Sequence, residues 1–106
     1  MDRVNAGSTY MIDLEFRDLV GQPVVPYEVN YSVFDVPTGT VLREPTPLAV
    51  GGSAHALELT PEDTDLVSQE NEEEYRGVVV FFKHGQNKQA SGQHRFVVRR
   101  VGGWIG

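Results

Sequence analysis

The sequence contains three sets of side chains whose types can support chemistry: a group of acids, two histidines and several serines. Carboxylate oxygens are the ligands that Ca²⁺ prefers, and the acids that could supply them are Glu62, Asp63, Asp65 and Glu70. The fixed glycine of a calcium loop is missing from this stretch. Thr60 followed by Pro61 is instead typical of a helix N-terminus. We therefore predict a solvated cap on one helical turn that runs to Leu66 or Val67, and no metal site.

His84 and His94 lie on either side of a predicted hairpin loop, and imidazole is a common zinc ligand. The sequence offers them no third ligand nearby, so we interpret both as structural histidines. A serine nucleophile needs a base and an acid that orients the base, and no serine follows the strand-turn-helix pattern of a nucleophile elbow. The sequence therefore predicts a protein that is not an enzyme, with no catalytic residue, metal or cofactor.

The chain of 106 residues has a net charge of −6 and no cysteine. The acidic balance disfavours nucleic acid as a partner, because phosphate contacts require a basic surface. No run approaches the ~20 apolar residues of a membrane span, and the N-terminus lacks the apolar stretch of a signal peptide. These features predict one domain made in the cytoplasm, with no membrane partner and a fold that rests on burial and backbone pairing.

Charge is segregated along the sequence. Residues 58–74 contain eight acids and no Lys or Arg, whereas residues 76–100 contain six basic residues and no acid. In an antiparallel sandwich, the acidic stretch and the loop at Lys88 would lie at opposite ends of one strand. We expect a head-to-tail contact steered by charge, between the acidic end of one molecule and the basic flank of another. The acidic end is formed by Glu72, Glu73 and Glu74, and the basic flank by Arg95 and Arg99.

Alternation of apolar and polar residues predicts the strands. It is clearest at residues 8–17 and 27–35, whose inward sides hold Tyr10, Ile12, Leu14 and Phe16 in the first and Tyr27, Val29, Tyr31 and Val33 in the second. Residues 40–44 and 55–59 predict two shorter strands, and Pro45 and Pro47 stop the first or confine it to an edge. Residues 75–83 and 93–100 predict a hairpin on which the rest of the chain packs, joined by a loop that contains Gly85, Asn87, Ser91 and Gly92.

Six short strands separated by turn residues, with almost no helix, predict an all-β antiparallel sandwich; a small open barrel is the alternative. We assign residues 8–101 to this domain, residues 1–7 to a flexible N-terminal segment and residues 102–106 to a flexible C-terminal tail. In the tail, Gly102 and Gly103 form a hinge before two large apolar residues, Trp104 and Ile105. We expect these two to reach a neighbouring protein.

The outer side of the predicted hairpin is unusually apolar. Val78, Val80 and Phe82 form the expected core side of its first strand. The alternation then places on the outer side an apolar stripe of Val79, Phe81 and Val97, joined by Phe34. Outer faces of antiparallel sheets are normally polar, so we interpret the stripe as a protein interface. The alternative is that the loop at residues 45–53 or the C-terminal tail folds over it.

The turns and strand ends occur in a familiar order, formed by Phe16-Arg17-Asp18, Gly21-Gln22-Pro23-Val24, the turn from Asp35 to Gly39, Leu57-Glu58-Leu59-Thr60-Pro61-Glu62-Asp63 and Tyr75-Arg76. Over about residues 8–101 the chain resembles the small immunoglobulin-like (Ig-like) domain proteins of tailed bacteriophages, and more loosely bacterial Ig-like repeats. The resemblance implies an Ig-like sandwich of six to seven strands, here without the cysteine pair and core tryptophan of antibody domains. Tyr75 is then either the tyrosine whose hydroxyl ties a strand corner to upstream backbone, or an ordinary strand residue.

The resemblance also implies a non-enzymatic structural or adaptor protein among the head, neck or tail components of a virion, present in the host cytoplasm before assembly. Its partners would be capsid, neck or tail proteins of the same virion, or copies of itself in a ring. The alternative is a carbohydrate-binding or adhesion module, in which exposed aromatic rings stack on sugars. Tyr10, Tyr27 and Tyr31 would have to point outward for that function, whereas the alternation places them inward.

Overall fold

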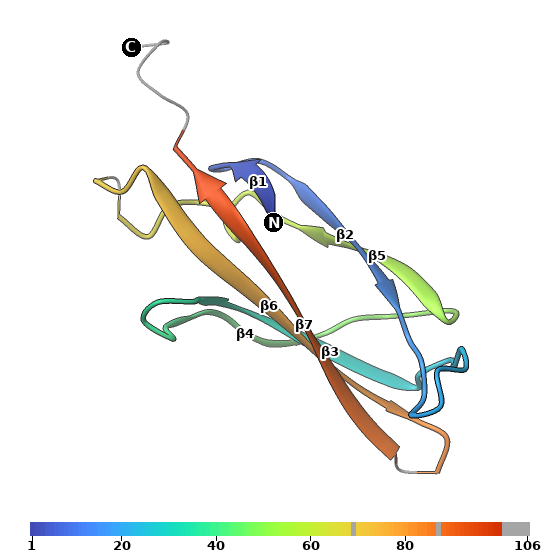
Figure 1. Ribbon diagram of the computed structural model, residues 1–106. Helices are drawn as coiled ribbons and strands as arrows, with labels where there is room; N and C mark the ends of the chain where they lie inside the picture. Colours follow the sequence, from blue (N-terminus) through green and yellow to red (C-terminus); the bar gives the residue numbers. More distant parts are fainter. Residues whose placement is uncertain (69, 87, 101–106) are drawn as a thin grey trace.

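The computed structural model describes residues 1–68, 70–86 and 88–100, which form two β-sheets and no helix (Figure 1). The larger sheet has five strands in the order β1-β7-β6-β3-β4, and the smaller sheet consists of β2 and β5. In chain order the strands are β1 (Asp2–Asn5), β2 (Tyr10–Glu15), β3 (Glu28–Asp35), β4 (Val41–Pro47), β5 (Ala54–Leu59), β6 (Glu73–His84) and β7 (Lys88–Arg99). The predicted all-β sandwich is confirmed.

The placement of five of the strands agrees with that in an Ig-like sandwich. In that fold strands C, F and G share one sheet, while B and E lie in the other. Here β3, β6 and β7 lie together in the larger sheet, as strands C, F and G do. β2 and β5 form the smaller sheet, as strands B and E do. The sandwich is not wholly antiparallel, because β1 pairs with β7 in parallel, with Asp2 opposite Phe96 and Asn5 opposite Arg99. The residues described include no helix long and apolar enough to cross a membrane.

The core lies between the two sheets and follows the predicted alternation. The smaller sheet and the residue that follows β2 contribute Ile12, Phe16, Leu57 and Leu59. The facing side of the larger sheet contributes Val4, Val29, Tyr31, Val33, Val78, Val80, Phe96 and Val98. Burial of each large apolar side chain contributes roughly 1.5–3 kcal/mol, so these two facing layers supply most of the stabilisation. The predicted inward side of residues 8–17 is confirmed.

The N-terminal segment departs from the sequence prediction. Residues 1–7 were expected to be flexible, but they contain β1, and Val4 is buried at 7% exposure. The chain in β1 reads Asp-Arg-Val-Asn, and one apolar residue gives no period that a sequence pattern could detect. The strand forms because β7 offers it a partner.

The central hairpin is longer than predicted. Ser91 and Gly92 lie inside β7 rather than in the loop, which is confined to the residues around Gly85, where φ is +58°. β4 likewise extends through Pro45 and Pro47. Proline removes a hydrogen-bond donor and is tolerated at sheet edges, and β4 is an edge strand with register shifts in its pairing.

The helical turn expected after Thr60 is absent, and the chain reverses there through hydrogen-bonded turns. The Asp63 carboxylate accepts a hydrogen bond from the Thr60 amide at 2.9 Å, as in a helix cap. The backbone carbonyls of Asp63 and Asp65, however, accept hydrogen bonds from Arg76 of β6. In a helix the Asp63 carbonyl would accept a hydrogen bond from the Val67 amide, which here donates to the Glu74 carboxylate instead. The prediction that Tyr27 lies in a strand and faces inward is also wrong. Tyr27 precedes β3 and is 57% exposed.

Candidate functional site

The outer face of the five-stranded sheet contains the apolar stripe that the sequence predicts. Val79 and Phe81 of β6 alternate outward from the buried Val78 and Val80, and Phe81 is 50% exposed. Tyr75 is on the same side of β6 and is 49% exposed. Together with Phe34 of β3, whose register partner on β6 is Gly77, these residues form what we call the outer stripe: Phe34, Tyr75, Val79 and Phe81.

Gly77 makes the outer stripe continuous. A Cβ at position 77 would lie 2.7 Å from Cε1 of Phe34, closer than a real Cβ approaches another heavy atom. The absence of a side chain therefore lets the Phe34 ring lie over β6, in the gap between Tyr75 and Val79. Small polar residues flank the exposed end of the stripe, because Asn30 and Ser32 of β3 and Ser91 and Gln93 of β7 are the register partners of Phe81 and Val79.

Val97 was predicted to be part of the exposed stripe, and this is wrong. Its side chain lies on the outer face but is only 6% exposed. Its register partners are Tyr75 on β6 and Arg3 on β1. Because the sequence did not reveal β1, it gave no sign that Val97 lies between two strands. Val97 therefore lies beside Tyr75 on the outer face but is covered, and it is not itself available for docking.

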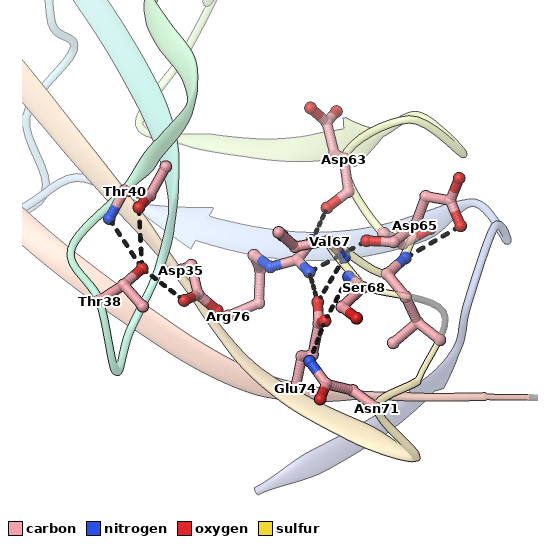
Figure 2. Close-up of polar contacts among 12 residues, drawn as sticks. Asp35, Thr38, Thr40, Asp63, Asp65, Val67, Ser68, Asn71, Glu74 and Arg76 are labelled. Atoms are coloured by element: carbon pink, nitrogen blue, oxygen red, sulfur yellow. Dashed lines mark hydrogen bonds and ion pairs between the residues drawn. The ribbon is translucent and has the colours of Figure 1, made fainter.

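A buried polar cluster fixes one end of the sandwich (Figure 2). Arg76 points from β6 to the interior and is 0% exposed. Its guanidinium donates to the backbone carbonyl of Asp63 at 2.5 Å, to that of Asp65 at 3.0 Å and to the Glu74 carboxylate at 2.8 Å. Arg76 Nε has no hydrogen-bond partner among the residues described. The cluster ties the loop after β5 to β6, so its role is to hold the fold.

Glu74 completes this cluster and is 5% exposed. Its carboxylate accepts hydrogen bonds from the amides of Val67 at 2.7 Å and Ser68 at 3.0 Å, and from the side chain of Asn71 at 2.7 Å. Burial by itself raises the pKa of Glu74, but these hydrogen bonds and the charge of Arg76 together outweigh burial and lower the pKa below its usual 4.5. The carboxylate is therefore ionised at neutral pH.

This lowered pKa makes stability depend on pH. The Glu74 carboxylate contributes its full stabilisation above the unfolded-state pKa of about 4.5, and that contribution is lost as the pH falls through the lower folded-state pKa. We expect the free energy of unfolding of the wild type to fall more steeply below pH ~4.5 than that of Glu74→Gln. Urea denaturation of both proteins between neutral and acidic pH measures this. Parallel curves would contradict the expectation.

Two of the four acids weighed as calcium ligands, Asp63 and Asp65, are engaged within the chain. Asp63 is 3% exposed and accepts hydrogen bonds from Arg43 of β4, with Nε 2.6 Å from Oδ1 and Nη2 3.1 Å from Oδ2. Asp65 accepts a hydrogen bond from the Leu66 amide at 2.9 Å. Over the ranges that the structure describes, no three His, Asp or Glu side chains gather as a metal site would require.

The segregation of charge along the sequence does not persist in the fold. Glu73 is the register partner of Arg99, and Arg99 Nε lies 3.9 Å from a Glu73 carboxylate oxygen. Arg100 lies 3.9 Å from Glu72 in the same way, and Glu74 is buried. The acidic end therefore contains its own cations, and Arg99 already has an acidic neighbour in the same chain; the head-to-tail contact between copies stays a prediction. Arg95 is exposed on the outer face opposite Gly77.

The two histidines do not face each other, because the register partner of His84 is Lys88 and that of His94 is Val78. His94 Nε2 lies 2.9 Å from the hydroxyl of Tyr10, which donates a hydrogen bond to Asp2 at 2.6 Å. Burial, followed by the contact with Asp2, raises the pKa of Tyr10. Its hydroxyl thus stays protonated, and it joins β1, β2 and β7 rather than acting as a nucleophile.

Sequence reasoning missed Arg76, although a signal was present. Position 76 shares the inward alternation of Val78 and Val80, and a charge on that side of a strand must find buried partners. Tyr75 behaves as an ordinary strand tyrosine, with no hydrogen bond from its hydroxyl to any described residue. Trp104 and Ile105, predicted to contact a neighbour, lie outside the described residues.

The outer stripe contains rings and aliphatic groups, with no acid, base or nucleophile stronger than the Tyr75 hydroxyl. Surfaces of this composition bind other surfaces by burial. The chain matches no family model, no curated protein and no solved structure.

Proposed function

We propose that this protein is a non-enzymatic structural or adaptor component of a tailed-phage virion that docks onto a neighbouring structural protein through the outer stripe. The observation that supports docking is the exposure of Phe81 and Tyr75, at 50% and 49%, on a sheet face that would normally be polar. The virion context rests on the resemblance of the turn and strand residues to those of phage Ig-like proteins. The Ig-like strand order is compatible with that resemblance and does not identify the partner.

The shape of the outer stripe suits a flat protein surface. From Tyr75 to Phe81 it follows β6 over about 20 Å, at ~3.3 Å per residue. Polar side chains from β3 and β7 border Val79 and Phe81, and an apolar centre with a polar rim is typical of protein interfaces. Arg95 is exposed beside this centre. The surface therefore fits a partner that presents an apolar patch with an acidic group next to it.

A carbohydrate-binding module remains the second candidate, because Tyr27 is exposed at 57% and not inward as predicted. Stacking on a glycan would need several rings on one surface. The Tyr27 amide donates a hydrogen bond to the carbonyl of Lys83 on β6. Tyr75 lies eight residues before Lys83 on the same strand, about 26 Å away at ~3.3 Å per residue. Tyr31 is buried. The exposed tyrosines therefore do not form one platform, which favours protein docking.

The test is incorporation into particles. In virions purified from the phage that encodes this chain, quantitative mass spectrometry is expected to find the wild-type protein at a fixed copy number per particle. Phe81→Asp is expected to be depleted at least about tenfold, since a carboxylate buried at an apolar contact costs more than the ~1.4 kcal/mol that a tenfold change requires.

Met11→Asp is the matched control, because Met11 is 51% exposed on the other sheet. It is expected to be incorporated like the wild type. Absence of the wild type from particles would overturn the virion assignment. Equal incorporation of Phe81→Asp and wild type would overturn the outer stripe as the docking surface.

A further inference from the structure

The edge of the larger sheet is open along part of β7. β1 pairs with β7 only from Phe96 to Arg99, so residues 88–95 have a strand neighbour on the β6 side alone among the residues described. Unpaired backbone groups at an edge are a template for another strand. Natural proteins protect such edges with charged side chains, bulges or proline. β4 contains Pro45 and Pro47, whereas the open part of β7 carries Lys88 and Arg95 only at its two ends. Residues 88–95 contain no proline.

A cleft lies directly beside this open edge, between the two sheets. Its volume is about 200 Å³. One wall is formed by Ile12, Leu14 and Phe16 at β2, the floor by Val78, Val80 and Phe82 of β6, and the other wall by Gly92, Gln93 and His94 of β7. Leu14 and Phe82 belong to the core but are only partly buried. The interior of the sandwich is therefore accessible from the side on which β7 lacks a neighbour.

Gly92 opens the cleft. It shares the inward alternation of His94 and Phe96, and a Cβ added to it would meet no atom within 4 Å. Its φ is not in the left-handed region, since the positive-φ glycines are Gly7, Gly21, Gly39 and Gly85. Glycine is thus not required there by the backbone, and its effect is to leave space where a core side chain would fit.

We propose that residues 88–95 and this cleft bind the C-terminal segment of a second copy of the chain, which adds a strand to β7 and inserts one large apolar side chain between the sheets. This is strand addition, in which backbone hydrogen bonds give affinity and a side-chain pocket gives specificity. The segment that follows β7 supplies two suitable side chains, Trp104 and Ile105. Consecutive strand residues point to opposite faces, so one enters the cleft and the other lies on the outer face.

The reach of the chain selects a second copy over the same copy. Gly92 lies seven residues before Arg99 on β7, about 23 Å at ~3.3 Å per residue. Ile105, the further of the two side chains, lies six residues after Arg99, at most about 22 Å away when fully extended. A returning chain would also have to reverse direction and pass β1, which already occupies the edge at Phe96–Arg99. The tail of another molecule is restricted neither by this reach nor by the need to pass β1.

The contact joins two different surfaces, so each copy can donate one tail and accept another. Such head-to-tail contacts produce a ring when the rotation closes and a filament when it does not. The inference deepens the proposed structural function and yet does not depend on the outer stripe. Variants of the cleft and of Phe81 therefore test the two separately.

The first experiment measures self-association of the full chain by sedimentation velocity up to about 1 mM, which detects dissociation constants of that order. The wild type is expected to associate as its concentration rises. Gly92→Val, which fills the cleft, and the double variant Trp104→Ala/Ile105→Ala are each expected to weaken association at least about tenfold. Phe81→Asp is expected to associate like the wild type.

Gly52→Val is the matched control, because a Cβ at Gly52 also meets no atom within 4 Å and its φ is not positive. It is expected to associate like the wild type. Gly92→Val is expected to melt at or above the wild-type temperature, because valine favours strands and occupies free space; circular dichroism checks this. A monomeric wild type, or association unchanged in Gly92→Val, would overturn the proposal.

A second experiment uses the absence of cysteine from the sequence. Gln93→Cys lies on the open edge of β7 beside the cleft, with its side chain on the outer face, and Gly103→Cys lies in the tail, so a mixture of these two single variants in a thiol redox buffer is expected to form mainly the disulfide-linked heterodimer. A mixture of Gly52→Cys and Gly103→Cys is expected to form at least about tenfold less disulfide-linked heterodimer. A chain with both Gln93→Cys and Gly103→Cys is expected to link between molecules. A disulfide within one molecule would overturn the choice of a second copy.

Discussion

Replacing Arg76 with methionine is expected to lower the free energy of unfolding by about 3–5 kcal/mol, the usual effect of removing one partner of a buried ion pair. The change leaves the carbonyls of Asp63 and Asp65 and the Glu74 carboxylate without their shared donor. Total stabilities of domains are typically about 5–15 kcal/mol, so the loss is a large fraction of the whole. Urea denaturation at neutral pH measures it.

Arg99→Met is the control for this substitution, since Arg99 faces Glu73 across 3.9 Å with both side chains about half exposed, at 51% and 42%. Exposed pairs contribute about 0–1 kcal/mol. The double variant Glu74→Gln/Arg76→Met is expected to recover part of the loss, because the uncompensated charge is gone. Equal destabilisation by Arg76→Met and Arg99→Met would show that the buried cluster does not hold this end of the sandwich.

Val78→Asp is expected to unfold the domain, whereas Phe81→Asp is expected to leave it folded. Val78 is 1% exposed in the core and Phe81 is 50% exposed on the outer face, although they lie three residues apart on one strand. An unpaired carboxylate in the core costs several kcal/mol. Loss of the cooperative thermal transition in Val78→Asp and its retention in Phe81→Asp would be visible by circular dichroism.

Val79→Asp extends this comparison to a half-buried position on the outer face and is expected to destabilise less than Val78→Asp. If Phe81→Asp also unfolds the isolated protein, then the outer face is covered by the chain itself, and the outer stripe cannot be a docking surface.

The strands that show clear alternation could be predicted from the sequence. Tyr10 to Phe16 and Val29 to Val33 face the core as their pattern indicates, because an apolar residue at every second position has only one way to be buried in a sheet. The turn that ends at Gly39, where φ is +72°, was likewise predictable, since a positive φ selects glycine. The outer placement of Val79 and Phe81 follows from the same rule.

The exposure of those residues was decided by the tertiary structure. Val97 shares the alternation of an exposed residue but is covered because β1 pairs with β7, and nothing in the four residues of β1 announces that pairing. The open edge at residues 88–95 exists for the same reason, since β1 ends where it does. Which strand lies beside which is a property of two distant segments at once.

Charge shows the same division between local and distant information. The sequence by itself determined that the acids are concentrated in residues 58–74 and the cations in residues 76–100. Only the hairpin register placed Arg99 beside Glu73, and only the packing of the loop after β5 turned Glu74 and Arg76 into a buried pair. Side-chain alternation depends on residues two positions apart and is readable in one sequence. The partner of a charge depends on which segments meet in space, and that contact is fixed only when the sheets pack together.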